Sequence, residues 1–256
     1  MKILKILVAC EYSGIVRDAF EDAGWDAWSC DILPTESQQT KASGKHVVED
    51  VLHLLYGRNF FIDFVEGCRF PEEDLEKDEE YQQAKRIPEN WDLLIGHPPC
   101  TYLSFAYTGK ERYSTERLQE KINAYQFFLD LWNAPVEHIC LENPMGYVHT
   151  GLLPYTQIVE PYYFGHNYKK KTCLWLKNLP KLQYSLTDNL FEKKTAQEPT
   201  HLFINYGYSR KRNPPKLPSI CKPFADKKEK SKFHKGVARA MAQQWTEHIN
   251  QLRIKN

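Results

Sequence analysis

The chain has 256 residues, of which 42% are hydrophobic and 13% aromatic, and its formal net charge at pH 7 is +1. A chain of this length and composition can bury a core of one large α/β domain or slightly more, so disorder of the whole chain is not expected. The near-neutral charge gives no global sign of a nucleic-acid or membrane partner, although residues 66–80 are strongly acidic and residues 208–235 strongly basic.

The seven cysteines are scattered along the chain, with neither a CxxC pair nor a Cys/His cluster at zinc-ligand spacing. Several lie inside apolar stretches, such as Cys140 in HICLEN and Cys173 in KTCLWL. This pattern predicts reduced thiols, no bound metal and a cytoplasmic protein. No stretch approaches the roughly 20 apolar residues of a membrane span, and the first ten residues lack the apolar core of a signal peptide, so no membrane association is expected.

Strand and helix patterns alternate along the first part of the chain. The apolar run KILKILVAC predicts a first buried strand, and GIVRDAFEDAG then has the apolar spacing of a helix that stops at Gly24. A second strand, WDAWSCDIL, is expected to end at Asp31. After Gly44, the stretch KHVVEDVLHLL predicts a third short strand that enters a helix.

Further along, WDLLIGHPPC predicts a fourth strand, residues 114–133 a helix, and VEHICLENP a fifth strand. YKKKTCLWLKNL predicts a strand or hairpin, an irregular basic segment follows, and HKGVARAMAQQWTEHINQLRI predicts the final helix. Strands that alternate with helices favour an α/β fold with a doubly wound, mostly parallel sheet. We expect a core at residues 1–177 with an acidic insertion at 56–88, a small variable basic segment at 178–232, and a C-terminal helix at 233–256 that completes the core.

In such a sheet, ligands bind beyond the carboxyl ends of the strands. The turn ACEYSG joins the first strand to the first helix, so its backbone N–H groups can approach a ligand, and Gly14 removes a side-chain obstacle. The turn matches neither GxGxxG nor GxxxxGK[ST], so dinucleotide and ATP binding are not supported. The residues expected at the strand ends, which should meet in one crevice, are Cys10, Glu11, Tyr12, Ser13, Gly14, Asp31, Asp50, Pro98, Pro99, Cys100, Glu142, Asn143 and Pro144.

Two aspartates in this set suggest a nucleoside-containing ligand. Asp31 ends the second strand, where a carboxylate can accept hydrogen bonds from a ribose diol. Asp50 closes the third strand, where it can receive the amino group of an adenine. Each aspartate can instead cap a helix, and residues after Asp50 would accept it as an N-cap.

The thiol of Cys100 follows Pro98 and Pro99, which fix the local backbone and present it just beyond the sheet. An exposed, locally stabilised thiolate is a strong nucleophile. Glu142, at the end of the neighbouring strand, would raise the pKa of that thiol if ionised, so it is a poor activator. It fits better as a partner of a substrate ring nitrogen while the thiol attacks carbon, a division of labour that suits a pyrimidine, whose C6 is electrophilic once N3 is protonated.

The order ACEYSG, Asp31, Asp50, HPPC and LENP resembles the C5-cytosine DNA methyltransferases, whose hallmarks include a Pro-Cys nucleophile and a Glu-Asn dipeptide. The strings HPPCTYLS, LENP and KKTCLWLKNLP are similar to the compact, often phage-encoded branch of that family, and GVARAMAQQW stands where the family completes its cofactor pocket. The resemblance covers most of the chain outside residues 56–88. It implies the Rossmann-like fold of class I S-adenosylmethionine-dependent methyltransferases. It also implies a protein of a bacterial or phage-infected cell that takes part in restriction-modification.

By that resemblance, Cys100 attacks cytosine C6 in a covalent adduct, Glu142 assists at N3, and C5 takes the methyl group, with Pro99 and Asn143 completing the catalytic motifs. The substrate would be double-stranded DNA whose target cytosine flips out of the stack. The residues implied for S-adenosylmethionine are Cys10, Glu11, Tyr12, Ser13, Gly14, Asp31, Ile32, Asp50, Val51 and Pro98. Those implied for DNA are Lys169, Lys170, Lys171, Arg210, Lys211 and Arg212.

The chain departs from the family in its first loop, CEYSG instead of Phe-x-Gly-x-Gly, and in the short distance between LWLKNLP and HKGVARA. Full-length members place a large recognition domain there, so specificity here is short, relaxed or supplied by a protein partner. Alternative functions stay open: an amino methyltransferase acting on an exocyclic amine, a methyltransferase for RNA or a free nucleotide, and an inactive methyltransferase-like protein that binds nucleic acid or counters host defence.

Overall fold

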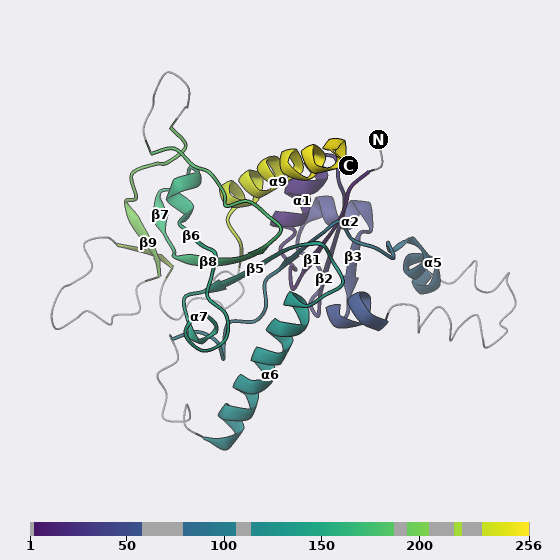
Figure 1. The fold of residues 1–256 in the computed structure, drawn as a ribbon, viewed down its shortest axis with the longest axis horizontal. Coiled ribbons are helices and arrows are strands. Elements are labelled where there is room, and N and C mark those ends of the chain that lie inside the picture. The colour runs from purple at the N-terminus through teal and green to yellow at the C-terminus, as the bar shows by residue number, and fades with distance from the viewer. Residues whose placement is uncertain are drawn as a thin grey trace, which may run out of the picture.

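The computed structural model describes residues 3–57, 79–105, 114–186, 194–204, 218–221 and 232–255. Its central sheet has seven strands in the spatial order β3-β2-β1-β4-β5-β8-β6, and a second sheet has three, β10-β9-β7 (Figure 1). The strands of the central sheet are β1 (Lys5–Ala9), β2 (Asp26–Asp31), β3 (His46–Val48), β4 (Leu93–Gly96), β5 (His138–Pro144), β6 (Gln157–Val159) and β8 (Thr172–Lys177). Those of the small sheet are β7 (Tyr168–Lys169), β9 (His201–Ile204) and β10 (Ser219–Cys221).

Strands β3, β2, β1, β4 and β5 run parallel, whereas β8 runs antiparallel to both β5 and β6. This crossover order is that of a doubly wound sheet. The Rossmann-like α/β fold predicted from the sequence is therefore confirmed.

The helices are α1 (Ile15–Asp22), α2 (Gln38–Ser43), α5 (Glu79–Arg86), α6 (Thr115–Trp132), α7 (Tyr147–Gly151) and α9 (Lys235–Lys255), with a π-helical turn η1 (His53–Gly57) and a 3-10 turn η3 (Pro161–Phe164).

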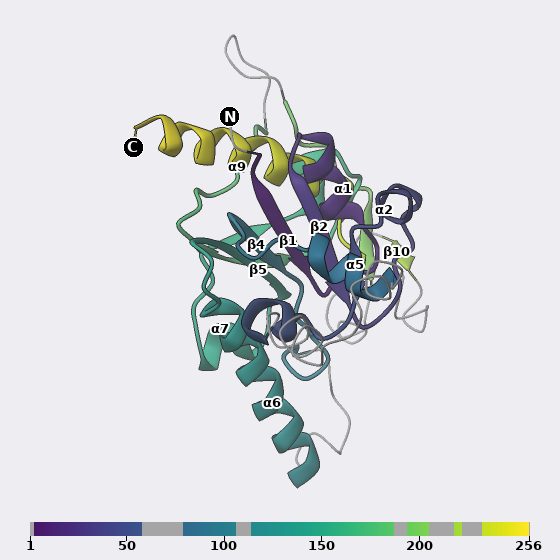
Figure 2. The same cartoon turned by 90° about the vertical axis from the view of Figure 1, so that its right-hand side faces the viewer.

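The sheet carries a hydrophobic core on each face because successive side chains of a strand point to opposite sides. In β1, Ile6 and Val8 pack against α1 and α9, whereas Leu7 and Ala9 pack on the side covered by α6. Figures 1 and 2 show α1 and α9 together on one side of the sheet and α6 on the other. Burial on both faces explains why the strands appear in the sequence as continuous apolar runs.

The central strands and the helices α1, α6 and α9 lie where the sequence predicted them, within a few residues. The short helix α2 and the strands β6, β9 and β10 were not predicted, because they are brief and lack a clear apolar period. No described helix is both long enough and apolar enough to cross a lipid bilayer.

The predicted hairpin at residues 168–179 is wrong, and the alternative, a strand, holds for β8. β8 pairs with β5 and β6, whereas β7 pairs with β9 in the small sheet. The reason is burial: Cys173, Leu174 and Trp175 are all enclosed, so β8 belongs inside the central sheet. Lys169 of β7 is exposed and pairs with Leu202 of β9.

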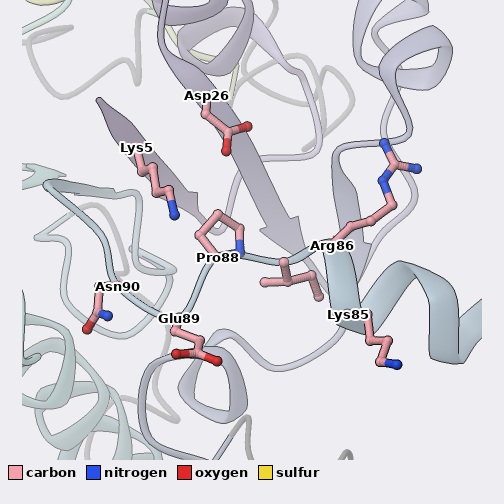
Figure 3. Close-up of a pocket in the computed structure, with 8 residues that line it drawn as sticks. Lys5, Asp26, Lys85, Arg86, Pro88, Glu89 and Asn90 are labelled. Carbon is pink, nitrogen blue, oxygen red and sulfur yellow. The ribbon is translucent and has the colours of Figure 1, made fainter. Parts of the chain in front are cut away.

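A polar hollow of about 310 Å³ lies at the amino ends of β1 and β2 (Figure 3). A second hollow, of about 550 Å³, lies near the start of β5 and includes His138 and His248. Ligands of parallel α/β sheets bind at the opposite edge, beyond the carboxyl ends. The functional site is therefore expected at that edge. The residues around the first hollow are Lys5, Asp26, Lys85, Arg86, Ile87, Pro88, Glu89 and Asn90.

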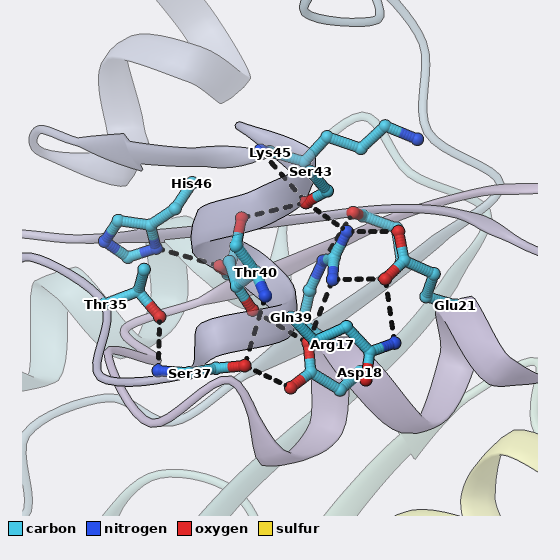
Figure 4. Close-up of polar contacts among 12 residues, drawn as sticks. Arg17, Asp18, Glu21, Thr35, Ser37, Gln39, Thr40, Ser43, Lys45 and His46 are labelled. Carbon is cyan, nitrogen blue, oxygen red and sulfur yellow. Dashed lines mark hydrogen bonds and ion pairs between the residues drawn. The ribbon is translucent and has the colours of Figure 1, made fainter.

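A buried arginine ties α1 to the sheet and to α2 (Figure 4). Arg17 has no exposed surface, and its Nε donates to the carbonyl oxygen of Ala27 in β2 at 2.9 Å. Its Nη1 donates to Asp18 at 2.9 Å and to Glu21 at 2.6 Å, and its Nη2 donates to Glu21 and, at 2.8 Å, to Ser43 Oγ. Every N–H group of the guanidinium therefore donates to an acceptor, as a buried charge requires.

Replacing Arg17 with methionine should lower the free energy of unfolding by about 3 kcal/mol, because it leaves two carboxylates without their buried partner. The control is Lys45→Met, which removes the half-exposed ion pair of Lys45 with Asp26 at 2.8 Å. That change should cost less than about 1 kcal/mol. Urea denaturation of both variants measures the difference, and equal losses would contradict the role given to Arg17.

Candidate active site

The site lies at the point where the strand order reverses. β1 sits between β2 and β4, and the chain leaves β1 toward one side and β4 toward the other. The loops that follow β1 and β4 therefore open a crevice at the carboxyl edge, where ligands bind in sheets of this kind. The amide of His97 donates to the carbonyl oxygen of Ala9 at 3.0 Å, which holds the two loops side by side as they leave the sheet.

The first loop, residues 10–14, has two positions in the left-handed backbone region. Cys10 has φ 58° and Gly14 has φ 72°. A Cβ atom at Gly14 would come within 2.4 Å of the Cβ of Ser37. Both the positive φ and this lack of space therefore require glycine at position 14. Tyr12 is buried, and its carbonyl oxygen accepts the amide of Glu36 at 2.8 Å. The loop is thus held in one shape by its own backbone and by the start of α2.

Glu11 points back at its own helix. Its carboxylate accepts the amides of Val16 at 2.7 Å and Arg17 at 3.0 Å, and the hydroxyl of Ser13 at 3.2 Å. Burial raises the pKa of Glu11, and the nearby His97 and these backbone N–H groups oppose the rise. Glu11, a predicted cofactor residue, therefore accepts the first amides of α1, and these contacts hold the loop in shape.

Asp31 stands half-buried at the end of β2. Its Oδ1 accepts the amide of Leu33 at 2.9 Å, and burial raises the pKa of its carboxyl, opposed mainly by that hydrogen bond. His46 holds the same turn, because its Nε2 donates to the carbonyl oxygen of Leu33 at 2.9 Å while Nδ1 lies 2.8 Å from Ser29 Oγ. The turn that carries Asp31 is therefore fixed before any ligand arrives.

Asp50 is exposed, and its Oδ1 accepts the amide of Leu52 at 3.0 Å, the helix-capping contact that the sequence left open. Val51 is buried, and Ile32 is 75% exposed. Burial raises the pKa of Cys10 well above its usual value, and the charges of Asp31 and Asp50 both add to the rise. The two carboxylates therefore both act on the first loop.

The turn that carries Cys100 is braced from both sides. Pro98 is buried and its carbonyl oxygen accepts the Nδ2 of Asn143, itself 1% exposed, at 2.7 Å. Pro99 and Cys100 are exposed. On the other side, the carbonyl oxygen of Cys100 accepts the amides of Leu103 at 3.1 Å and Ser104 at 2.9 Å. The thiol is presented on a rigid turn at the open edge of the sheet.

This turn continues into a close backbone contact. The amide of Tyr147 donates to the carbonyl oxygen of Leu103 at 2.7 Å, and Ser104 forms a bridge with Gly146. A Cβ atom at Gly146 would lie 2.0 Å from the carbonyl oxygen of Leu103. Only glycine permits this approach, so the segment after β5 supports the turn of Cys100.

Glu142 lies near the end of β5, and its Oε2 is 3.3 Å from the Nδ1 of His97. Both side chains are mostly buried, with 15% and 11% of their surface exposed. The sequence did not single out His97 as a site residue. The available signal was its position, a polar residue directly before the two prolines of HPPC.

The pKa of the Cys100 thiol is raised, first by desolvation and then by the negative charge of Glu142, although the residue is exposed at the surface. The ammonium of Lys170 opposes the rise. Lys169 and Lys171 are exposed, and their charges instead lower the raised pKa of the buried Glu160. The three lysines predicted to bind nucleic acid therefore differ, and only Lys170 acts on the thiol. Arg210, Lys211 and Arg212 lie outside the described residues.

Within the ranges that the structure describes, no group of three or more His, Cys, Asp or Glu side chains is arranged to hold a metal ion. The site instead combines a thiol, carboxylates, an imidazole and a lysine. That combination is suited to nucleophilic and proton-transfer chemistry.

No protein-family model matches the chain, and no curated protein matches it. Among solved structures, it is similar to a candidate DNA modification methyltransferase encoded within a prophage of E. coli, with 18% identity and a TM-score of 0.39 over 68% of this chain and 46% of that one. It is also similar to the Dnmt2 methyltransferase of S. pombe, with 16% identity and a TM-score of 0.38 over 70% of this chain and 52% of that one.

The chain thus matches about half the length of each of these two proteins. Both are methyltransferases, the class that the sequence resemblance names. At these identities and TM-scores the likeness carries no argument about function, which rests on the residues of the crevice.

The surroundings of Cys100 predict opposite effects of two substitutions on its pKa. Glu142→Gln removes a negative charge and should lower the pKa of the thiol, whereas Lys170→Met removes a positive charge and should raise it. The pH dependence of Cys100 alkylation, followed by peptide mass spectrometry, measures both shifts. Lys169→Met is the matched control and should leave the profile in place. Shifts of the same sign in the two variants would refute the arrangement.

Proposed function

We propose that the protein transfers a methyl group from S-adenosylmethionine to C5 of cytosine in DNA. One observation carries the proposal. An exposed thiol on a braced Pro-Pro turn and a glutamate on the next strand, whose charge acts on that thiol, lie at the crevice where a sheet of this order binds its ligand. A nucleophile and a proton-handling group are the two parts that attack on a pyrimidine ring requires.

In this mechanism the Cys100 thiolate forms a bond to C6 of cytosine, and the ring electrons move toward C5. The carboxyl of Glu142 donates its proton, or a hydrogen bond, to N3 as negative charge develops there. After C5 is methylated, a water molecule takes the C5 proton, the thiolate leaves C6 and the N3 proton returns to Glu142, which restores the aromatic ring. The thiol must ionise for the first step, so the charge of Lys170 favours the attack and the charge of Glu142 opposes it.

The crevice fits S-adenosylmethionine in the groups it offers. Asp31 presents a half-buried carboxylate at the end of β2, suited to a ribose diol, and the loop of residues 10–14 offers backbone groups near the strand end. Asp50, Ile32, Val51 and Pro98 would line the remainder. When bound, the cofactor supplies an electrophilic methyl group. Glu11 would act indirectly, through the shape of the loop.

DNA is the proposed substrate, with the target cytosine flipped into the crevice. Lys169 and Lys171 are exposed on the same segment as Lys170, and Arg210, Lys211 and Arg212 are proposed to add phosphate contacts. We retain the proposed division into a methyltransferase core at residues 1–177, a recognition segment at 178–232 and a final helix at 233–256. A protein partner for specificity is part of the proposal.

A duplex containing 5-fluorocytosine should form a covalent adduct with the protein in the presence of S-adenosylmethionine, because fluorine at C5 blocks the final elimination. The adduct should survive denaturation and map to Cys100 by mass spectrometry. Cys100→Ser should abolish it, whereas Cys173→Ser, at a buried thiol, should not. An adduct at another cysteine would overturn the assignment, and no adduct with the wild-type protein would overturn C5 chemistry.

Asp31→Ala should weaken S-adenosylmethionine binding about tenfold or more, since a charge-assisted hydrogen bond contributes roughly 1.5–3 kcal/mol. Asp22→Ala removes an exposed aspartate at the end of α1 and should leave the affinity unchanged. Isothermal titration calorimetry gives both affinities. Equal affinities in the two variants would remove Asp31 from the cofactor site.

A further inference from the structure

His97 is the first residue after β4, and neither the proposed mechanism nor the sequence motifs give it a task. Its Nδ1 lies 3.3 Å from Glu142 Oε2. Its backbone amide donates to Ala9, and its ring packs against Phe233 with centroids 4.9 Å apart. The imidazole is therefore held by a strand, by an aromatic ring and by the proposed catalytic carboxyl.

The hydrogen-bond pattern indicates which nitrogen carries the proton. A carboxylate oxygen only accepts, so the 3.3 Å contact is a hydrogen bond when Nδ1 donates to Glu142 Oε2. The Nε2 atom is shielded from solvent and has no hydrogen-bond partner in the described parts of the chain. A proton on Nδ1 therefore accounts for the contact with Glu142.

We propose that His97 is a positioning residue that holds the Glu142 carboxyl through Nδ1–H···Oε2, so that the other oxygen faces the cytosine ring. The inference rests on the proposed function, since it assigns how the carboxyl of that reaction is oriented. A side chain of glutamate has three rotatable bonds, and a misplacement of about 1 Å can cost on the order of 10²-fold in rate. A hydrogen bond to one oxygen removes that freedom before the substrate binds.

The location of His97 also joins the two halves of the crevice. Its charge, when present, would act on Glu11 of the first loop and Asp31 of β2, as well as on His234 before α9. Glu142 of β5 is its direct partner. His97 is thus within electrostatic reach of both the cofactor side and the base side.

The test separates positioning from packing with two variants. His97→Asn keeps a side-chain N–H near the place of Nδ1, whereas His97→Phe keeps an aromatic ring against Phe233 but has no donor. We expect His97→Phe to slow single-turnover adduct formation on the 5-fluorocytosine duplex by about 30-fold, and His97→Asn by less than about fivefold. Thermal unfolding midpoints and S-adenosylmethionine affinity should match the wild type in both.

A double-mutant cycle with Glu142→Ala shows whether His97 acts through Glu142. Without the carboxyl there is nothing to position, so His97→Phe should slow the Glu142→Ala protein by less than about twofold. The inference is overturned if the two losses multiply, if His97→Asn is as slow as His97→Phe, or if His97→Phe is as fast as the wild type. An inert wild-type protein is a different result, because it overturns the proposed function itself and the inference with it.

Discussion

The pairing of β1 with β4 determines the geometry of the candidate site. Ala9 lies opposite Gly96, so the loops that begin at Cys10 and His97 leave the sheet at the same level. β5 extends the register, since Gly96 pairs with Leu141 and the next residue is Glu142. A slip of one residue in either pair would turn Glu142 or its neighbours to the other face. The thiol, the imidazole and the carboxyl are brought together by backbone hydrogen bonds made in the core.

Burial within the crevice favours the neutral forms of its acidic groups. Burial raises the pKa values of Glu11, Asp31 and Cys100, and the carboxylates raise those of nearby thiols further. Lys170 is the described cation that lowers the pKa of Cys100. A raised thiol pKa lowers the fraction of thiolate and so slows oxidation of the sulfur. The same burial makes each remaining charge act more strongly, because the local dielectric is low.

Much of the fold could be predicted from the sequence because its signals are local. The apolar runs of β1, β4 and β5 indicate buried strands, and the Pro-Pro-Cys sequence indicates a turn, each from a few neighbouring residues. The role of Glu11 could not be predicted, since a carboxylate in a loop is equally suited to a ligand and to a helix start. The contact of His97 with Glu142 joins residues 45 positions apart in the chain. The adjacent residues Lys169 and Lys170 act on different groups, Glu160 and Cys100. Such contacts follow from tertiary packing, and the spacing of apolar residues along the sequence does not indicate them.

Gly146 has no side chain, yet the turn of Cys100 depends on it. The carbonyl oxygen of Leu103 occupies the space that a Cβ atom would need, and the obstacle is main chain that cannot rotate away. Any other residue would push the 103–104 backbone outward, and with it the carbonyl of Cys100 that this backbone binds. Position 146 therefore controls where the thiol of Cys100 lies, although its own residue contributes no side chain to the crevice. A methyl group added there would shift the thiol without contacting it.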